Sequence, residues 1–322
     1  MLSSRRKSAV AVLLAALLAL APAAVPAESE EEAEKYQSDL RDGVELLKNG
    51  SRAEVTRAIA KFKSALKIRP DSAEAYYWIG VAYSDQNNYL RAADNAKDAT
   101  IYDERLAEAW LLWGQTLLYQ KDWPGALEKL ETAERLAPDD PMTLFNLGRV
   151  YYHGLADPGA AYAKFNRIWQ NSGELRRENP ENAGLVLRAR LYMGYCEFDR
   201  GNWANAINAF QDVLREEPDN YPASLRLGLA LRRSGRAREC ESILWELLRA
   251  VPDADPANRQ LRAEINLQLA DLYLKEAAVR NGMLALTHLR EFVGLTGDLS
   301  HPALEPAREY LARNARDESL DG

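Results

Sequence analysis

The sequence has few of the side chains from which most catalytic and metal sites are built. Its 322 residues include two cysteines and three histidines, and His153, His288 and His301 lie far apart along the chain. No histidine or cysteine pair has the spacing of a metal site, and no glycine-rich phosphate loop follows a strand pattern. Two cysteines also cannot form a disulfide framework. These absences predict a protein that is not an enzyme and that uses no metal or cofactor.

Blocks of positive charge and long apolar runs are missing from residue 28 onward. The chain carries a formal net charge of −7, and loss of the first 27 residues would take it to −10 because Arg5, Arg6 and Lys7 are removed. An acidic chain without a basic patch does not suit binding of nucleic acid or of an anionic membrane surface. No segment after residue 27 is long and apolar enough to span a bilayer.

The first 27 residues have the pattern of a secretory signal peptide. Three basic residues precede an uninterrupted apolar run from Ala9 to Ala21, and Val25 and Ala27 stand at the −3 and −1 positions of a cleavage site. We expect cleavage and a periplasmic or secreted bacterial protein, and an uncleaved N-terminal anchor is the alternative. Residues 28–35, which hold five glutamates, are expected to form a solvated acidic linker.

A glycine recurs at a fixed step through the chain. Gly80, Gly114 and Gly148 are 34 residues apart, and the same step separates Gly194 from Gly228. Each glycine lies inside an apolar pattern of helical period, where it costs about 1 kcal/mol relative to alanine. No stretch alternates with the period of two that strands show. The regular step therefore indicates one backbone contact repeated in an array of helices.

Aligning the units shows which positions of the repeat agree. In the unit that starts at Ala107, repeat positions 4, 7, 8, 11, 20, 24, 27 and 32 hold Trp110, Trp113, Gly114, Leu117, Ala126, Leu130, Ala133 and Pro138. The small residues at positions 8 and 20 let the two helices of a hairpin approach closely, and the proline ends the second helix. This pattern resembles the tetratricopeptide repeat family, and the match extends over most of the chain after the first 27 residues.

The resemblance implies an all-α fold, a right-handed superhelical solenoid of about seven helical hairpins with a C-terminal capping helix. The array is expected over residues 36–300 and the capping helix over 301–317, followed by a tail of 318–322. The hairpin units are predicted near residues 36–72, 73–106, 107–140, 141–171, 187–220, 221–254 and 258–295. The extra residues between Gly148 and Gly194 fall in 171–184, which we expect to be a polar loop between two units.

Both cysteines occupy positions of the repeat at which small residues recur. Cys240 stands at position 20 and Cys196 at position 10, where other units carry alanine. We expect two free, buried side chains, and a single disulfide between them is the alternative.

Members of this family bind peptides or protein segments in a concave groove lined by the first helix of each hairpin. The resemblance therefore implies a groove at repeat positions 2, 5, 9, 12 and 13. The candidate contact residues at these positions are Tyr77, Tyr119, Phe145, Arg149, Tyr152, Tyr195, Phe198 and Arg232. The aromatic residues would grip the ligand, and the arginines would hold acidic groups through bidentate hydrogen bonds. The alternative is that several of the aromatic side chains pack against the next helix and contact no ligand.

The leading hypothesis is a non-enzymatic scaffold in the bacterial cell envelope that binds a partner protein or peptide segment. The alternative is an accessory subunit that binds a glycan or small molecule for an enzyme complex of the envelope. Self-association, through an apolar end of the array or through the groove, also stays open. Neither hypothesis involves nucleic acid, a cofactor or a membrane span after removal of the signal peptide.

Overall fold

The computed structural model describes residues 29–253, 255–296 and 301–318, and the predicted signal peptide and the last four residues lie outside this part. Every regular element in the described part is a helix. The chain divides into two compact units, residues 1–189 and 190–322, and the division falls inside helix α11. The all-α array of hairpins that the sequence predicts is confirmed.

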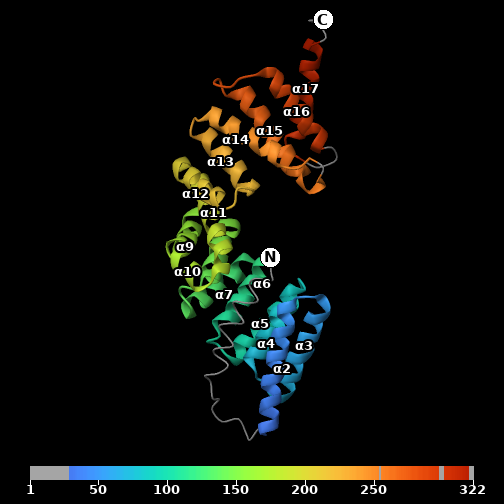
Figure 1. Cartoon of the computed structure of the whole chain (residues 1–322), viewed down its shortest axis with the longest axis vertical. Coiled ribbons are helices and arrows are strands. Elements are labelled where there is room, and N and C mark those ends of the chain that lie inside the picture. The colour runs from blue at the N-terminus through green and yellow to red at the C-terminus, as the bar shows by residue number, and fades with distance from the viewer. Residues whose placement is uncertain (1–28, 254, 297–300, 319–322) are drawn as a thin grey trace. The chain divides into compact units, whose positions relative to one another are not determined.

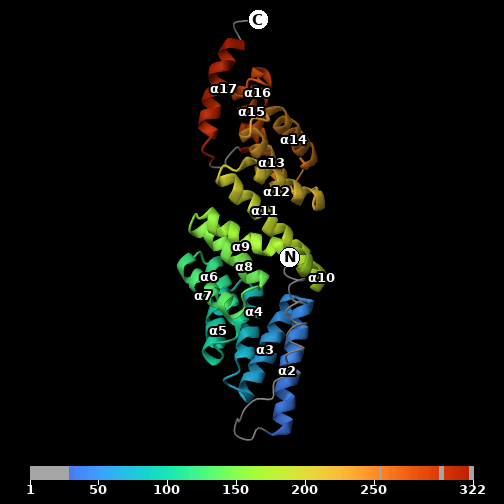
Figure 2. The same cartoon turned by 90° about the vertical axis from the view of Figure 1, so that its left-hand side faces the viewer.

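Unit 1 holds four hairpins. Their helices are α2 (Glu30–Asn49) with α3 (Arg52–Ile68), α4 (Ala73–Asp85) with α5 (Tyr89–Tyr102), α6 (Ala107–Tyr119) with α7 (Trp123–Leu136), and α8 (Pro141–Arg149) with α9 (Pro158–Gln170). Helix α8 continues directly into a π-helical turn, η1 (Val150–Gly154). The helices from α2 to α7 lie side by side in Figures 1 and 2, and α4 contacts both α2 and α6.

Unit 2 continues the same arrangement. Helix α11 (Ala183–Asp199) leads into it and packs on α12 (Trp203–Glu216), with the Tyr195 and Phe210 rings 5.7 Å apart. Two further hairpins follow, α13 (Tyr221–Arg233) with α14 (Ala237–Ala250) and α15 (Arg259–Lys275) with α16 (Gly282–Thr296); the 3-10 turn η3 (Pro256–Asn258) precedes α15. The described residues thus form seven hairpins, as the sequence predicts.

Prolines mark the ends of the second helices. Pro70, Pro138, Pro218 and Pro252 each lie two residues beyond the last residue of α3, α7, α12 and α14 respectively. A proline ring clashes with the preceding helical turn and supplies no N–H, so the helix stops before it. The next helix therefore starts at a defined position, and this keeps the repeat in register.

The recurring glycines let the two helices of a hairpin approach closely. A Cβ on Gly194 would lie 2.5 Å from Cε1 of Phe210, and one on Gly114 would lie 2.6 Å from Cγ of Leu130. The same Gly114 position is 3.3 Å from the carbonyl oxygen of Ala126. These distances leave no room for a methyl group. The glycines are therefore required by packing between helices, which is the repeated backbone contact expected from their spacing.

The predicted acidic linker is mostly helical, so this expectation is wrong. Helix α2 begins at Glu30, and the Ser29 hydroxyl accepts a hydrogen bond from the Glu32 N–H while the Glu32 side chain reaches back to Ser29. Carboxylates are favourable at the positive end of a helix dipole. The run of glutamates thus stabilises a helix start, although its side chains stay exposed as predicted.

The segment 171–184, predicted as a polar loop, also contains helical structure. It holds α10 (Ser172–Glu178), the 3-10 turn η2 (Pro180–Asn182) and the first residues of α11. Leu175 is buried, and its carbonyl oxygen accepts a 3.0 Å hydrogen bond from the Asn182 side chain. The hydrogen bond closes the inserted segment on itself, while α10 with its buried leucine contacts α9. Sequence polarity alone did not reveal this packing.

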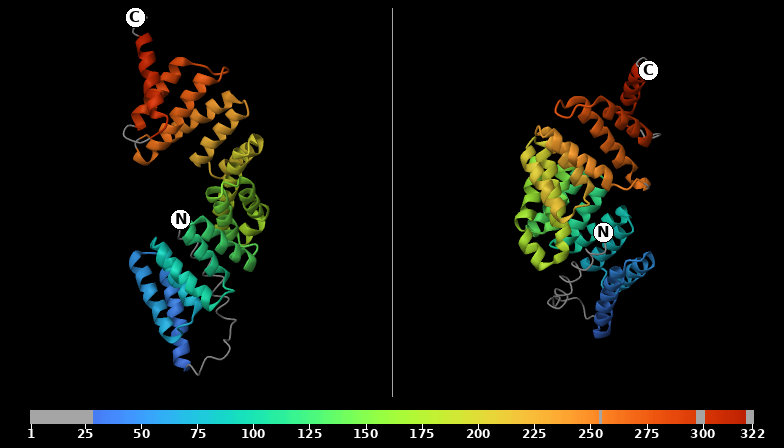
Figure 3. Two further views of the ribbon diagram at one scale, coloured as in Figure 1. Left: turned by 180° about the vertical axis from the view of Figure 1, so that it is seen from behind. Right: turned by 45° about the horizontal axis from the view of Figure 1, so that its top comes forward.

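A capping helix ends the described chain. Helix α17 (Leu304–Glu318) contacts α16 and is visible beside it in Figures 2 and 3. Leu304 and Ala307 are buried in one cluster with Leu289 and Phe292 of α16. The predicted cap is confirmed, with its helical start at residue 304 rather than 301. Within the described ranges, no helix combines the length and the apolar character that crossing a membrane requires.

Candidate protein-binding surface

Three successive hairpins of unit 1 place a row of planar side chains at their surface. The rings of Tyr89 and Tyr119 are stacked with centroids 4.7 Å apart and planes 12° apart. The guanidinium carbon of Arg149 lies 5.6 Å from the Tyr119 centroid. Tyr119 is 47% exposed. We call Tyr89, Tyr119 and Arg149 the tyrosine row.

Local structure at the ends of α4 and α6 positions the row. Each of these helices is followed by one residue in the left-handed region, Asn87 at φ 58° and Lys121 at φ 61°. These turns bring the chain directly into the next helix, so Tyr89 is the first residue of α5 and Tyr119 the last of α6. The Tyr89 hydroxyl donates a 2.9 Å hydrogen bond to the Asn87 side chain. The two rings are therefore held by short turns rather than by long loops.

In the hairpin of α8 and α9, the spacing between the glycine and its contact on the second helix is one residue longer. Gly148 and its contact Phe165 are 17 residues apart, whereas Gly114 and Leu130 are 16 apart. The π-helical turn η1 widens the end of the first helix and accommodates the extra residue. Tyr152 lies in this turn, three residues after Arg149, with its ring 4.9 Å edge-on from that of His153.

Arg149 has unused capacity to hold an anion. Its guanidinium makes a long 3.4 Å hydrogen bond to the Asn146 side chain, and among the described residues no carboxylate forms an ion pair with it. Partial burial and the Arg149 charge lower the pKa of His153, so that imidazole is neutral at pH 7. Arg149 is thus the cation at this end of the row, and its planar fork suits a carboxylate.

Tyr77 and Phe145 are packed inside unit 1. Tyr77 is 8% exposed and meets Trp78 edge-on at 5.1 Å, and Phe145 is 4% exposed and meets Phe165 edge-on at 5.5 Å. Burial raises the pKa of Tyr77 far above its usual range. For these two residues the geometry matches the alternative in which the aromatic side chain packs against neighbouring helices.

Tyr195 and Phe198 form a separate half-buried pair in unit 2. The guanidinium carbon of Arg226 lies 5.6 Å from both ring centroids. Such cation–π contacts are favourable by about 0.5–1 kcal/mol near a surface. The chain itself therefore supplies a cation to these two rings.

Arg232 is paired with carboxylates of its own unit. Its side chain is 15% exposed and forms ion pairs with Asp271 at 2.7 Å and Glu276 at 2.9 Å. The two carboxylates lie 39 and 44 residues further along the chain, so sequence proximity did not indicate them. Carboxylates of unit 2 thus already bind the Arg232 guanidinium and compete with the predicted contact to an acidic group of a partner.

The cysteines are free and buried, as expected from their repeat positions. Burial raises the pKa of each thiol to about 12. A thiol with so high a pKa is protonated at neutral pH and is a poor nucleophile. In the described ranges, His, Cys, Asp and Glu side chains do not gather in groups that could hold a metal ion.

Sequence reasoning missed Tyr89 and Arg226. Tyr89 stands at repeat position 17, and Trp123 and Trp203 occupy the same position in their units. An aromatic residue recurring at the start of the second helix is a usable signal, although the groove expected from the family resemblance involves only the first helices. Arg226 carried no such signal, because its role depends on the two rings that it covers.

The hairpins, their glycine contacts and their terminal prolines define an α-helical repeat protein of the solenoid class. The chain belongs to the tetratricopeptide repeat family, whose repeat models match residues 52–87, 111–174 and 197–265, together more than half of the chain. The TPR repeat-containing protein MJ1428 of Methanocaldococcus jannaschii is 23% identical over 247 residues, 66% of this chain and 42% of that protein. The chain thus spans less than half the length of this relative.

Solved structures show the same fold. PilF of Pseudomonas aeruginosa superimposes with a TM-score of 0.57 at 20% identity, covering 73% of this chain and 100% of that one. YrrB, described as a TPR protein with an unusual peptide-binding site, has a TM-score of 0.51 at 21% identity, covering 60% of this chain and 93% of that one. At these identities the similarity establishes the architecture of repeated hairpins.

Proposed function

We propose that this chain is a non-enzymatic scaffold that binds a partner protein or peptide segment at the tyrosine row of unit 1. The observation that carries the proposal is Arg149, a half-buried cation with no carboxylate partner among the described residues, lying against the exposed ring of Tyr119. Tyrosine and arginine, with tryptophan, are enriched among the residues that dominate the energy of protein interfaces.

The family supports this class of function. Tetratricopeptide repeat proteins are generally scaffolds for protein–protein interaction, and the match to the family covers both units. The peptide-binding site named for YrrB is a property of that protein. That site shows that this fold can bind a peptide, and it supports our proposal of a peptide ligand to that extent.

We place the scaffold in a bacterial cell envelope, either periplasmic or secreted. The support is the pattern of residues 1–27, a basic start, an apolar run and a small-residue cleavage site. The partner would then be an envelope protein. Glycan binding for an envelope enzyme complex is the outcome to examine if no protein partner is found.

Affinity capture from an envelope fraction tests the proposal. The bait is the chain from residue 28 onward, compared with a Tyr119→Ala/Arg149→Met variant. We expect one protein to be retained by the parent and lost at least about tenfold by the variant, because both changes remove central contacts. Isothermal titration with that purified protein measures the loss.

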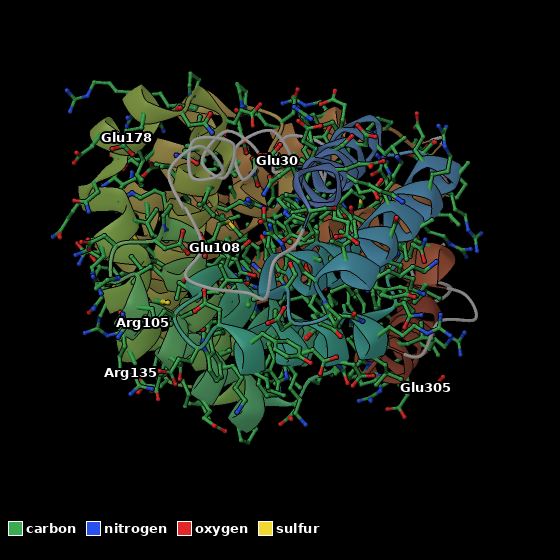
Figure 4. The ribbon with its side chains drawn as sticks, turned by 90° about the horizontal axis from the view of Figure 1, so that it is seen from below. Glu30, Arg105, Glu108, Arg135, Glu178 and Glu305 are labelled. Atoms are coloured by element: carbon green, nitrogen blue, oxygen red, sulfur yellow. The ribbon has the colours of Figure 1, made fainter. Side chains whose placement is uncertain are left out.

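The matched control is Arg135→Met. Arg135 is exposed on the last turn of α7 and lies at the outer edge in Figure 4. It carries the same charge in the same unit but is not part of the row, so capture should equal that of the parent. If the parent and the row variant are both folded by circular dichroism and capture the partner equally, the partner binds outside the tyrosine row.

A further inference from the structure

A second surface of unit 1 exposes apolar and aromatic side chains at the end of α5. Ile101 is 65% exposed and Tyr102 is 49% exposed. The Tyr102 ring is stacked on Tyr76 of α4, with centroids 5.3 Å apart and planes 13° apart. Exposed apolar patches of this kind are frequently sites of interaction. These residues, together with Asp94 and Asp98, are called the α5 patch.

Two carboxylates border the stacked tyrosines without forming an ion pair. Asp94 and Asp98 are four residues apart on α5, so their side chains are neighbours on one face of the helix. In the described part of the chain neither forms a salt bridge. Burial and the Asp94 charge raise the pKa of Asp98, which the adjacent Lys97 offsets only partly. The α5 patch therefore combines like negative charges with two aromatic faces.

In the following hairpin, a lysine of the chain itself contacts aromatic and acidic side chains. Lys129 lies 4.4 Å from the Trp113 centroid and 5.9 Å from that of Trp110, and its ammonium is 2.6 Å from the Glu128 carboxylate. Trp110 and Trp113 are themselves stacked at 5.7 Å. A lysine of the chain thus supplies the cation that the aromatic pair and the carboxylate attract.

The α5 patch shares one acidic and one aromatic position with this hairpin, but its second ring comes from Tyr102 of α5, and Ile79 stands where the next unit has Trp113. Asp94 and Glu128 share repeat position 22, and Tyr76 and Trp110 share position 4. The position of Lys129 is taken by Asn95, whose side chain donates to the carbonyl oxygen of Arg91. At the position where the next hairpin carries a lysine beside its carboxylate and aromatic side chains, the α5 patch therefore has a neutral amide.

We propose that the α5 patch docks a basic segment of a partner protein. A lysine or arginine of that segment lies beside Asp94 and Asp98 and against the Tyr76–Tyr102 stack, and a neighbouring apolar residue covers Ile101. Opposite charge orients the segment, and burial of the apolar groups adds affinity. This surface shares no residue with the tyrosine row, whose Tyr89 lies at the opposite end of α5, so it gives the scaffold a second contact of defined chemistry.

Selection from a display library of random 12-residue peptides tests the proposal. The bait is the chain from residue 28 onward, and peptides whose binding depends on Arg149 are set aside with an Arg149→Met bait. We expect enrichment of peptides that contain lysine or arginine next to an apolar residue. Fluorescence anisotropy should then show at least about tenfold weaker binding to Asp94→Asn/Asp98→Asn, since the charge attraction is lost.

Two further variants make the outcome specific. Asn95→Lys gives the α5 patch the cation that Lys129 provides in the next hairpin, and it should weaken the same peptides. Glu30→Gln/Glu31→Gln removes the same charge from an exposed helix start of unit 1 and should leave binding unchanged. Enrichment of peptides without basic residues, no enrichment at all, unchanged binding to the Asp94/Asp98 variant, or an equal loss in the Glu30/Glu31 control would each overturn the proposal.

Discussion

At the scale of the residue, the glycine of each first helix faces one side chain of the second helix. The contact differs in tightness between hairpins. A Cβ on Gly148 would meet the fully buried ring of Phe165 at 2.5 Å, whereas a Cβ on Gly228 would meet Leu244 Cδ2 at 3.3 Å. A rigid aromatic ring cannot yield as an aliphatic side chain can. The same repeat position therefore tolerates an added methyl group to a different degree in different units.

Replacing these two glycines with alanine tests that difference. Overpacking costs about 1–3 kcal/mol, and alanine recovers about 1 kcal/mol of helix propensity. The 2.5 Å approach places Gly148 at the upper end of the overpacking range, so Gly148→Ala should lower the free energy of unfolding by about 2 kcal/mol, while Gly228→Ala should change it by less than about 1 kcal/mol. Urea denaturation followed by circular dichroism measures both. Equal effects at the two positions would contradict the packing explanation.

At the scale of the element, helix α17 covers the apolar face of the last hairpin. Phe292 is fully buried and Leu289 is 5% exposed beneath it. Each hairpin of an array buries its apolar face against a neighbour, so the last one requires a cap with a polar outer side. The outer side of α17 carries exposed ion pairs such as Arg308 with Glu305.

Ending the chain at residue 301 should destabilise unit 2 and cause association. Exposure of large buried side chains costs about 1.5–3 kcal/mol each, so the thermal midpoint should fall by several degrees. Light scattering should show a concentration-dependent increase in mass. Arg313→Ala, which breaks only the exposed pair with Glu309, is the control and should match the parent. An unchanged midpoint in the truncated chain would show that α17 is not a cap.

At the scale of the whole molecule, protonation of buried groups couples stability to pH. His288 is 3% exposed, and its Nδ1–H donates a 2.7 Å hydrogen bond to Asn266 Oδ1. Its Nε2 has no hydrogen-bond partner in the described structure. A second proton there would be buried without an acceptor, and burial accordingly lowers the pKa of His288.

Stability should therefore fall as the pH drops below about 6.5, the ordinary histidine value. The unfolded chain takes up a proton in that range while the folded chain resists it, so acid favours unfolding. The contribution is fully present above pH 6.5 and is lost progressively towards the lower folded pKa. Thermal midpoints between pH 7.5 and 5 should decline more steeply for the parent than for His288→Gln. Parallel slopes for the two proteins would rule out His288 as a source of the dependence.

The position of a residue in the repeat predicted which side chains share a face of the array. It did not predict which of these side chains stay exposed and free to contact a partner. Tyr77, Tyr119 and Arg232 all stand at groove positions, yet Tyr77 is buried, Tyr119 is exposed, and Arg232 is paired with carboxylates of α15 and the turn after it. Availability depends on the neighbours that packing brings to each position. The helical insertion at 171–184 escaped prediction for the same reason, since its packing depends on one buried leucine.

The sequence by itself determined the helices, their pairing into hairpins and the close contact at each glycine, because these follow from local periodicity, a fixed 34-residue step and proline stops. Tertiary structure alone decided the surface chemistry. The Tyr89–Tyr119 stack, the ion pairs of Arg232 and the cation over Trp113 join side chains from different helices or different turns. Their energies depend on distances of a few ångströms, and distances between side chains of different elements are set only when the helices pack.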